Sequence, residues 1–241
     1  MNRIEEVFGI PRVLLPVVHP VGHDEAMSSI RVAVEAGVKG IFLINQGMSA
    51  EEVLELVMVV RAQLPALWVG INLLGVPPAE VLRRGLAACA GRLDGIWADN
   101  ADIDENAPSQ PVAQELVDAR RARGWTGLYF GGVAFKYQRE VPSASLGRAA
   151  QAAMPFMDVI CTSGPGTGKE AEVDKVIAMR TGIGSGGSLA LASGVTDGNV
   201  AGYLPYVDAY LVGTGIEREF GILDPVKVSR LEQIIAGYAP G

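Results

Sequence analysis

The stretch LALASGVT, from Leu189 to Thr196, is an apolar run that stops at a turn containing glycine. The stretch YLVGTG, from Tyr210 to Gly215, repeats this pattern. Such runs are typical of buried parallel strands, and the small residues at their ends leave backbone N–H groups free to surround an anion. In a (β/α)8 barrel, the loops after strands 7 and 8 are a frequent phosphate site. The two stretches therefore predict a parallel sheet and a place for a ligand.

Apolar, β-branched runs recur along the whole chain, with helix-like stretches between them. They begin near Val13, Gly40, Leu67, Asp94, Gly127, Asp158, Ser188 and Asp208. Except before the last run, the spacing is close to the ~30 residues of one βα unit. Eight such units predict a single TIM-barrel domain, an α/β fold spanning residues 1–241, with a short helix in residues 1–11 covering the barrel floor.

The predicted helices fill the gaps between these runs. A capping box at 49–52 begins one helix, and the segment 77–80 places proline in the first turn of the next. The others are predicted over 24–36, 110–123, 146–153, 170–180, 199–206 and 224–239. A doubly wound open sheet uses the same units, but no Gly-x-Gly-x-x-Gly motif follows the first run. The turns suited to phosphate also come from the last two units, so we favour the barrel.

Composition and charge exclude several classes of protein. The formal net charge is -7, from 27 acidic and 20 basic residues without a basic cluster, which argues against a nucleic-acid partner. The first residues include Glu5 and Glu6 where a signal peptide needs a basic segment and then an apolar one, and no later apolar run is long enough to span a bilayer. We expect a soluble cytoplasmic protein without membrane insertion. Cys89 and Cys161 have no metal-like spacing and are interpreted as core residues without a disulfide.

Polar residues end most of the predicted strands, and barrel enzymes take their reacting groups from these positions. Asp99 is a candidate general base or stabiliser of a developing cation, or else a loop cap. His19 is a candidate hydrogen-bonding or acid–base group. Lys136 follows an apolar stretch, and we rank charge stabilisation there above a Schiff base. Asn45 and Asn72 are the substrate-binding candidates at two further strand ends.

The loop from Thr162 to Lys169 follows the sixth strand and leads into a helix, so its N–H groups and lysine are suited to an anion. It resembles a Walker A loop but fails the test at two positions. The required first glycine falls at Ser163, and Glu170 occupies the place of the magnesium-binding residue. We interpret it as a substrate loop, with a flexible glycine turn as the alternative. Its substrate-binding candidates are Ser163, Gly164, Thr167 and Lys169.

Two patterns that suggest metal sites do not hold up. The segment 102–106 begins like a calcium loop, but Ala107 replaces the turn glycine and Ala113 the bidentate glutamate. His19 and His23 have a spacing that binds metal on a helix, but the proline and glycine between them indicate a loop. We expect no metal and no cofactor.

The last three units resemble the BtpA family of barrel proteins, and the similarity runs from about residue 13 to 235. The residues that carry it are 158–164 with Thr167 and Gly168, 193–196 with Asn199 and Val200, 212–214, Gly221, and Pro225 with Val226. His19 fits the family's strand-one histidine, and Phe135–Tyr137 resembles its Lys-His pair with Tyr in place of His. The first loop lacks the family's fuller Pro-Leu-Pro-Gly run. The resemblance implies a phosphate-site TIM barrel, with one branch linked to photosystem I accumulation and others to sugar or nucleoside metabolism.

Two functions compete. The first is an enzyme that binds a small phosphorylated metabolite, such as a sugar phosphate or nucleotide-like compound. Its phosphate would rest on Ser193, Gly194, Val195, Gly213 and Thr214. Asp99 with His19 or Lys136 would then serve proton transfer or oxocarbenium stabilisation, as in a lyase, isomerase or nucleosidase.

The second is a non-catalytic BtpA-like assembly or regulatory factor. An apolar outer patch too large for a monomer would distinguish it. The apolar helix 53–60 is the interface candidate, although core packing explains most of its character, and a homo-oligomer is compatible with the sequence.

Overall fold

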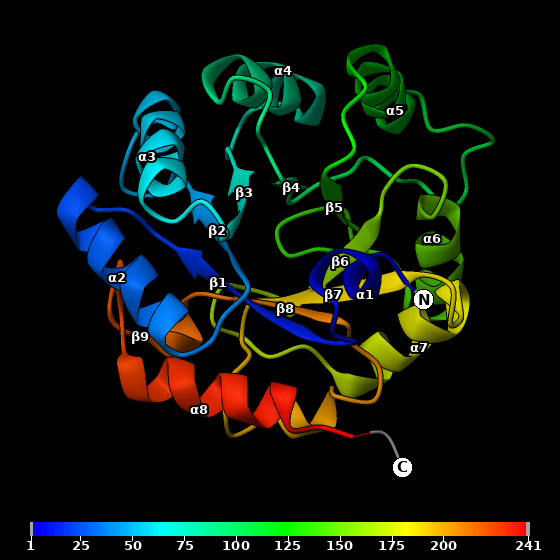
Figure 1. The fold of residues 1–241 in the computed structure, drawn as a ribbon. Helices are drawn as coiled ribbons and strands as arrows, with labels where there is room; N and C mark the ends of the chain where they lie inside the picture. Colours follow the sequence, from blue (N-terminus) through cyan, green and yellow to red (C-terminus); the bar gives the residue numbers. More distant parts are fainter. Residues whose placement is uncertain (1, 240–241) are drawn as a thin grey trace.

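Eight parallel strands close into a barrel in which each strand pairs with the next and β1 pairs with β8. This computed structural model describes residues 2–239. The strands are β1 Val13–Val18, β2 Gly40–Ile44, β3 Trp68–Asn72, β4 Gly95–Ala98, β5 Leu128–Gly132, β6 Val159–Ser163, β7 Ser188–Ala192 and β8 Ala209–Val212. Figure 1 shows the helices arranged around this sheet. The predicted (β/α)8 TIM barrel is therefore confirmed.

Helices and short turns connect the strands. The helices are α1 Arg3–Phe8, α2 His23–Glu35, α3 Ala50–Gln63, α4 Pro78–Ala88, α5 Pro111–Arg123, α6 Leu146–Ala153, α7 Val173–Ile183 and α8 Pro225–Ala236. The 3-10 turns are η1 Ser143–Ser145, η2 Val200–Gly202 and η3 Thr214–Ile216. After β8, an antiparallel pair of β9 Glu217–Glu219 and β10 Ile222–Leu223 precedes α8. None of the helices in residues 2–239 is both long and apolar enough to cross a membrane.

One helix prediction is wrong, and one predicted helix begins later than expected. The predicted helix 199–206 is only the turn η2, because Asn199 uses its side chain on nearby backbone: its Oδ1 accepts the Thr196 N–H, and its Nδ2 donates to the Gly194 carbonyl. The predicted helix 170–180 begins only at Val173. The residues before it stay in a loop because the backbone of Lys169 packs directly on Gly194.

The strands are apolar on both faces, and alternate residues fill two separate cores. Residues that point into the barrel form the inner core, which includes Val13, Leu15, Val17, Phe42, Ile44, Trp97, Phe130 and Leu211. Their neighbours along the chain, such as Leu14, Ile41 and Tyr210, pack outward against the helices. Both free cysteines are buried, Cys161 in the inner core and Cys89 in the outer one. This double burial explains why the strands appear in the sequence as continuous apolar runs.

The helix α1 covers one end of the barrel, as the sequence predicts. Ile4 is fully buried and belongs to the inner core. The Asn2 side chain donates to Asp208, and the Arg3 backbone N–H donates to the Ser188 hydroxyl, so the helix is tied to the starts of β7 and β8. Figure 1 shows α1 in front of the strands, within the ring of the other helices. The opposite end, at the C-terminal ends of the strands, is left for a site.

Three arginine–aspartate pairs fasten neighbouring units at the end of the barrel covered by α1. In each pair, an aspartate lies directly before an even-numbered strand. It accepts a backbone N–H from the preceding odd-numbered strand. It also contacts an arginine of the helix that leads into this odd-numbered strand. The pairs are Arg61–Asp94, Arg120–Asp158 and Arg180–Asp208, and the N–H groups belong to Val69, Tyr129 and Leu189. Charge-assisted hydrogen bonds of this kind are among the stronger ones in proteins. The repeated contact therefore helps to set the register of β3 to β8.

The corresponding position before β2 carries the opposite charges. Lys39 directly precedes β2, at the position that aspartate occupies before β4, β6 and β8. Glu232 lies on α8, at the position that arginine occupies on α3, α5 and α7. The two charges interact at a distance, but no ion pair joins them, and Glu232 Oε2 is buried without a hydrogen-bond partner among the described residues. Burial raises the pKa of Glu232 to about 7, and the charge of Lys39 opposes this shift.

This burial predicts a pH dependence of stability. The folded state holds a proton on Glu232 that the unfolded chain releases near its usual pKa of 4.5, so the free energy of unfolding falls as pH rises from 4.5 toward 7. Chemical denaturation compares the free energy of unfolding of Glu232→Gln with that of the wild type at two pH values. We expect this difference to favour the variant more at about pH 8 than at about pH 5. Glu55→Gln, at an exposed glutamate of α3, is the control. Equal differences at both pH values for Glu232→Gln would contradict the burial effect.

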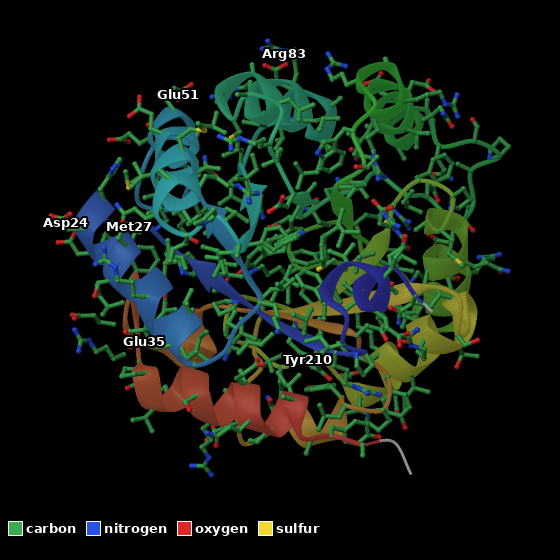
Figure 2. All side chains as sticks on the ribbon, viewed as in Figure 1. Asp24, Met27, Glu35, Glu51, Arg83 and Tyr210 are labelled. Carbon is green, nitrogen blue, oxygen red and sulfur yellow. The ribbon has the colours of Figure 1, made fainter. Side chains whose placement is uncertain are left out.

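Outside the barrel, the helices carry charged surfaces. Figure 2 shows Asp24, Glu51 and Arg83 at the outer edge of the molecule, whereas Tyr210 lies inside the ring of helices. The two long loops, 99–109 and 131–145, are joined by Arg139, which pairs with Glu105. These loops therefore support each other beside the C-terminal end of the barrel.

Candidate active site

A cavity of about 250 Å³ opens at the C-terminal ends of the strands. Its inner walls are apolar and come from residues of the inner core: Val17, Ile44, Trp97 and Leu211. Its polar side chains are His19, Gln46, Asp99, Lys136, Tyr137, Thr167, Ser193 and Thr214. The cavity therefore brings together the three predicted catalytic residues with the turns that follow β7 and β8.

The turns after β7 and β8 lie side by side. A side chain on Gly215 would overlap the carbonyl oxygen of Val195, so the second turn passes directly over the first. Ser193 and Gly194 both have positive φ, 65° and 70°, and serine seldom adopts this conformation. Ser193, Gly194, Gly213 and Thr214 line the cavity, whereas Val195 is fully buried behind it. A strained serine beside three small residues is typical of a backbone shaped for a ligand.

The ammonium of Lys136 points at the turn after β7. Its Nζ donates to the hydroxyl of Ser193 at 2.8 Å and to that of Thr167 at 3.2 Å. Its backbone N–H donates to Ser163 Oγ at 2.8 Å, so the buried Ser163 positions Lys136 and does not itself line the cavity. The lysine charge thus lies beside the predicted phosphate turns, where it favours an anion.

Asp99 lines the cavity directly after the end of β4. Its Oδ1 accepts a hydrogen bond from Asn72 Nδ2 at 2.9 Å. Burial raises the pKa of Asp99, while the Asn72 hydrogen bond and the charge of Lys136 oppose the shift. Asn72 is buried and lies outside the cavity lining, so its amide orients the carboxyl group. Gly132 allows this arrangement, since a side chain there would overlap the backbone carbonyl of Asp99.

His19, at the end of β1, is paired with a buried glutamate. Its Nδ1 lies 2.7 Å from Oε1 of Glu217, and both residues are more than 90% buried, with exposures of 9% and 7%. Phe220 stacks on the imidazole, with ring centroids 5.1 Å apart. Glu217 is absent from the predicted site residues because 198 positions separate it from His19. The one sequence signal is its place directly after the glycine turn that ends β8.

Of the remaining predicted residues, all but Thr167 lie apart from the cavity or behind it. Asn45 does not line the cavity, and its Oδ1 accepts the backbone N–H of Leu74 at 2.5 Å. Gly164 is buried where a side chain would overlap the backbone of Lys169 and Glu170. Lys169 is exposed and outside the lining, whereas Thr167 of the same loop belongs to it. The structure thus brings Thr167 to the other cavity residues and leaves Asn45, Gly164 and Lys169 in the surrounding framework.

Lys175 of α7 is a second lysine near the site, and no sequence pattern indicates its place. Its Nζ donates to the carbonyl oxygens of Ala134 at 2.5 Å and Ser163 at 2.7 Å. Burial lowers the pKa of this amine. Because it bridges the segment after β5 and the last residue of β6, Lys175 holds in place the backbone that carries Lys136.

Fold and site together define this protein as a (β/α)8 barrel with a polar cavity at its C-terminal mouth. Among residues 2–239, no group of three or more His, Cys, Asp or Glu residues is arranged to hold a metal ion. No protein-family model matches the chain, and no curated protein matches it.

Similar solved structures exist. Phosphoribosyl anthranilate isomerase from Thermus thermophilus has a TM-score of 0.63 and 14% identity, over 94% of this chain and 98% of the other. 3-keto-L-gulonate-6-phosphate decarboxylase from Vibrio cholerae O1 biovar El Tor has a TM-score of 0.68 and 12% identity, over 96% of this chain and 100% of the other. N-(5'-phosphoribosyl)anthranilate isomerase from Pyrococcus furiosus has a TM-score of 0.64 and 12% identity, over 94% and 100%. At this identity the similarity establishes the fold alone.

Proposed function

We propose that the protein is an enzyme that acts on a small phosphorylated metabolite. The phosphate binds at the turns after β7 and β8, on Ser193, Gly194, Gly213 and Thr214, and Lys136 supplies the positive charge. The observation that carries this proposal is the contact of Lys136 Nζ with Ser193 Oγ at 2.8 Å, beside a second glycine turn. A phosphate that reaches this place would exchange the lysine's neutral hydroxyl partners for charge-assisted hydrogen bonds.

The chemistry that we propose is acid–base catalysis of lyase, isomerase or nucleosidase type. Asp99 and His19 lie in the same cavity as the phosphate turns, so the substrate carbons would lie between them. Burial raises the pKa of Asp99, which makes its carboxylate a better proton acceptor than that of an exposed aspartate. His19 has a carboxylate partner, an arrangement that supports proton transfer.

Two of the similar structures add support of a general kind. Their names, phosphoribosyl anthranilate isomerase and 3-keto-L-gulonate-6-phosphate decarboxylase, describe enzymes whose compounds carry a phosphate group. A barrel of this class therefore suits a phosphorylated substrate. We also propose a relationship to the BtpA family, which depends on the sequence motifs alone. The alternative role as an assembly factor has less support, because Val53, Leu54, Leu56, Val57 and Val60 of α3 are buried in the core.

The proposal is tested by thermal unfolding in the presence of inorganic phosphate and of three- to five-carbon sugar phosphates, each compared with its unphosphorylated counterpart. A ligand that binds only the folded state raises the melting temperature. We expect the phosphorylated compounds alone to do so, and a crystal soaked in one of them to show its phosphate at Ser193, Gly194, Gly213 and Thr214. Equal effects of phosphorylated and unphosphorylated compounds, or a phosphate bound elsewhere, would refute the proposal.

A further inference from the structure

The pair formed by His19 and Glu217 is built into the wall of the cavity. The Glu217 carboxylate is fixed by a second hydrogen bond, since Oε1 also accepts the backbone N–H of Gly221 at 3.2 Å. Its backbone carbonyl accepts from Lys227 Nζ at 2.7 Å. Phe220, between the two β9–β10 strands, covers one face of the imidazole. Neither member of the pair is free to rotate away without breaking these contacts.

The pair determines which nitrogen of His19 is available for chemistry. A carboxylate can only accept, so the hydrogen bond at 2.7 Å places a proton on Nδ1. The other nitrogen, Nε2, then carries the lone pair, and it makes no hydrogen bond to any described residue. Because His19 lines the cavity, Nε2 is the nitrogen left for a ligand.

The imidazole also lies against the turn proposed to hold the phosphate. A side chain on Gly213 would come within 2.6 Å of His19 Cε1, so the absence of a side chain there lets the ring reach the turn. Lys136 is a poorer candidate for accepting a proton, because its ammonium already donates to Ser193 and Thr167. His19 is therefore a group with an available lone pair that lies directly against this turn.

We propose that Glu217 is a positioning residue that holds His19 with Nε2 facing the ligand, so that His19 takes up and returns a proton on the phosphorylated substrate. This inference rests on the proposed function. In the step, the Nε2 lone pair accepts the proton, and the electrons of the broken bond remain on the substrate. The imidazolium formed keeps its Nδ1 proton and is stabilised by the Glu217 carboxylate, and the reverse step returns the proton.

The chain offers a direct test, because it contains only two histidines, His19 and His23. Nitrogen-15 NMR of the imidazoles, at a pH where both are neutral, reports which nitrogen carries the proton. We expect wild-type His19 to be protonated on Nδ1. In Glu217→Gln, whose amide can donate as well as accept, part of this signal should move to the other tautomer, and Glu217→Leu should lose the Nδ1 preference. Glu219→Gln, at an exposed glutamate of the same strand, should match the wild type.

Inorganic phosphate then tests the direction of Nε2. We expect it to shift the Nε2 resonance of His19 and to leave that of His23 unchanged. An Nε2-protonated His19 in the wild type, or the wild-type tautomer retained in both Glu217 variants, would overturn the inference. So would phosphate that raises the melting temperature without changing the His19 resonance. If no phosphorylated compound raises the melting temperature, the proposed function fails, and so does the assignment of a phosphorylated substrate to His19. The tautomer experiment still accepts or rejects the positioning of His19 by Glu217.

Discussion

Lys136→Met is expected to weaken the binding of phosphate and of phosphorylated ligands roughly 10- to 100-fold, because a hydrogen bond to a charged group contributes ~1.5–3 kcal/mol. Methionine keeps the length and apolar stem of the side chain, so the packing beside Phe135 is preserved while the charge is removed. Titration with inorganic phosphate, followed by calorimetry or by the melting temperature, measures the change.

Lys169→Met is the matched control for this experiment. Lys169 belongs to the loop after β6, but its side chain is exposed and outside the cavity lining. Loss of the Lys169 charge should change the dissociation constant by roughly threefold or less, since exposed charges near a site act weakly at physiological salt. If Lys169→Met weakens phosphate binding as much as Lys136→Met, the anion lies at the loop after β6 and the site proposed here is wrong.

Phe42→Ala is expected to have the largest effect on stability, a loss of about 3–5 kcal/mol in the free energy of unfolding. Phe42 is fully buried in the inner core, and its ring packs edge-on against Phe130 at 5.1 Å, Trp68 at 5.2 Å and Trp97 at 5.7 Å between centroids. Alanine would leave a cavity that these rigid rings cannot fill, because each is held by the closed sheet.

Chemical denaturation measures this loss, and Val226→Ala is the control because Val226 is 73% exposed on α8. Its effect should stay within about 0.5 kcal/mol. A loss below ~1.5 kcal/mol in Phe42→Ala would mean that the inner core closes around the missing ring, contrary to the packing described here.

The barrel could be predicted from the sequence because its strands are buried on both faces. Continuous apolar runs at regular spacing, each ending at a polar residue or a glycine, leave few alternatives to eight βα units. The helix 199–206 could not be excluded, because the side-chain hydrogen bonds of Asn199 depend on the position of the Gly194 carbonyl. Local composition does not contain that information.

The site could be predicted in part. The turns after β7 and β8 lie together because consecutive parallel strands are neighbours in a barrel, so the proximity of Ser193 and Gly213 follows from the fold. The directions of side chains do not follow in this way. Asn72 ends a strand as Asp99 does, yet it supports the carboxyl group from behind the cavity wall. Glu217 could not be found, since its partner His19 lies at the other end of the chain and only the closure of β8 onto β1 joins them.

The reversed charges of Lys39 and Glu232 distinguish one part of the barrel, the sector made of α8, β1 and β2, from the parts joined by arginine–aspartate pairs. The three other contacts are formed by arginines. Because arginine remains cationic at every physiological pH, the charge of the basic partner in these contacts does not change with pH. The sector formed by α8, β1 and β2 lacks such a link and contains an acid that titrates near neutrality. His19 is carried by β1 of this same sector, whereas Lys136 follows β5, a strand whose neighbouring contact is the Arg120–Asp158 pair.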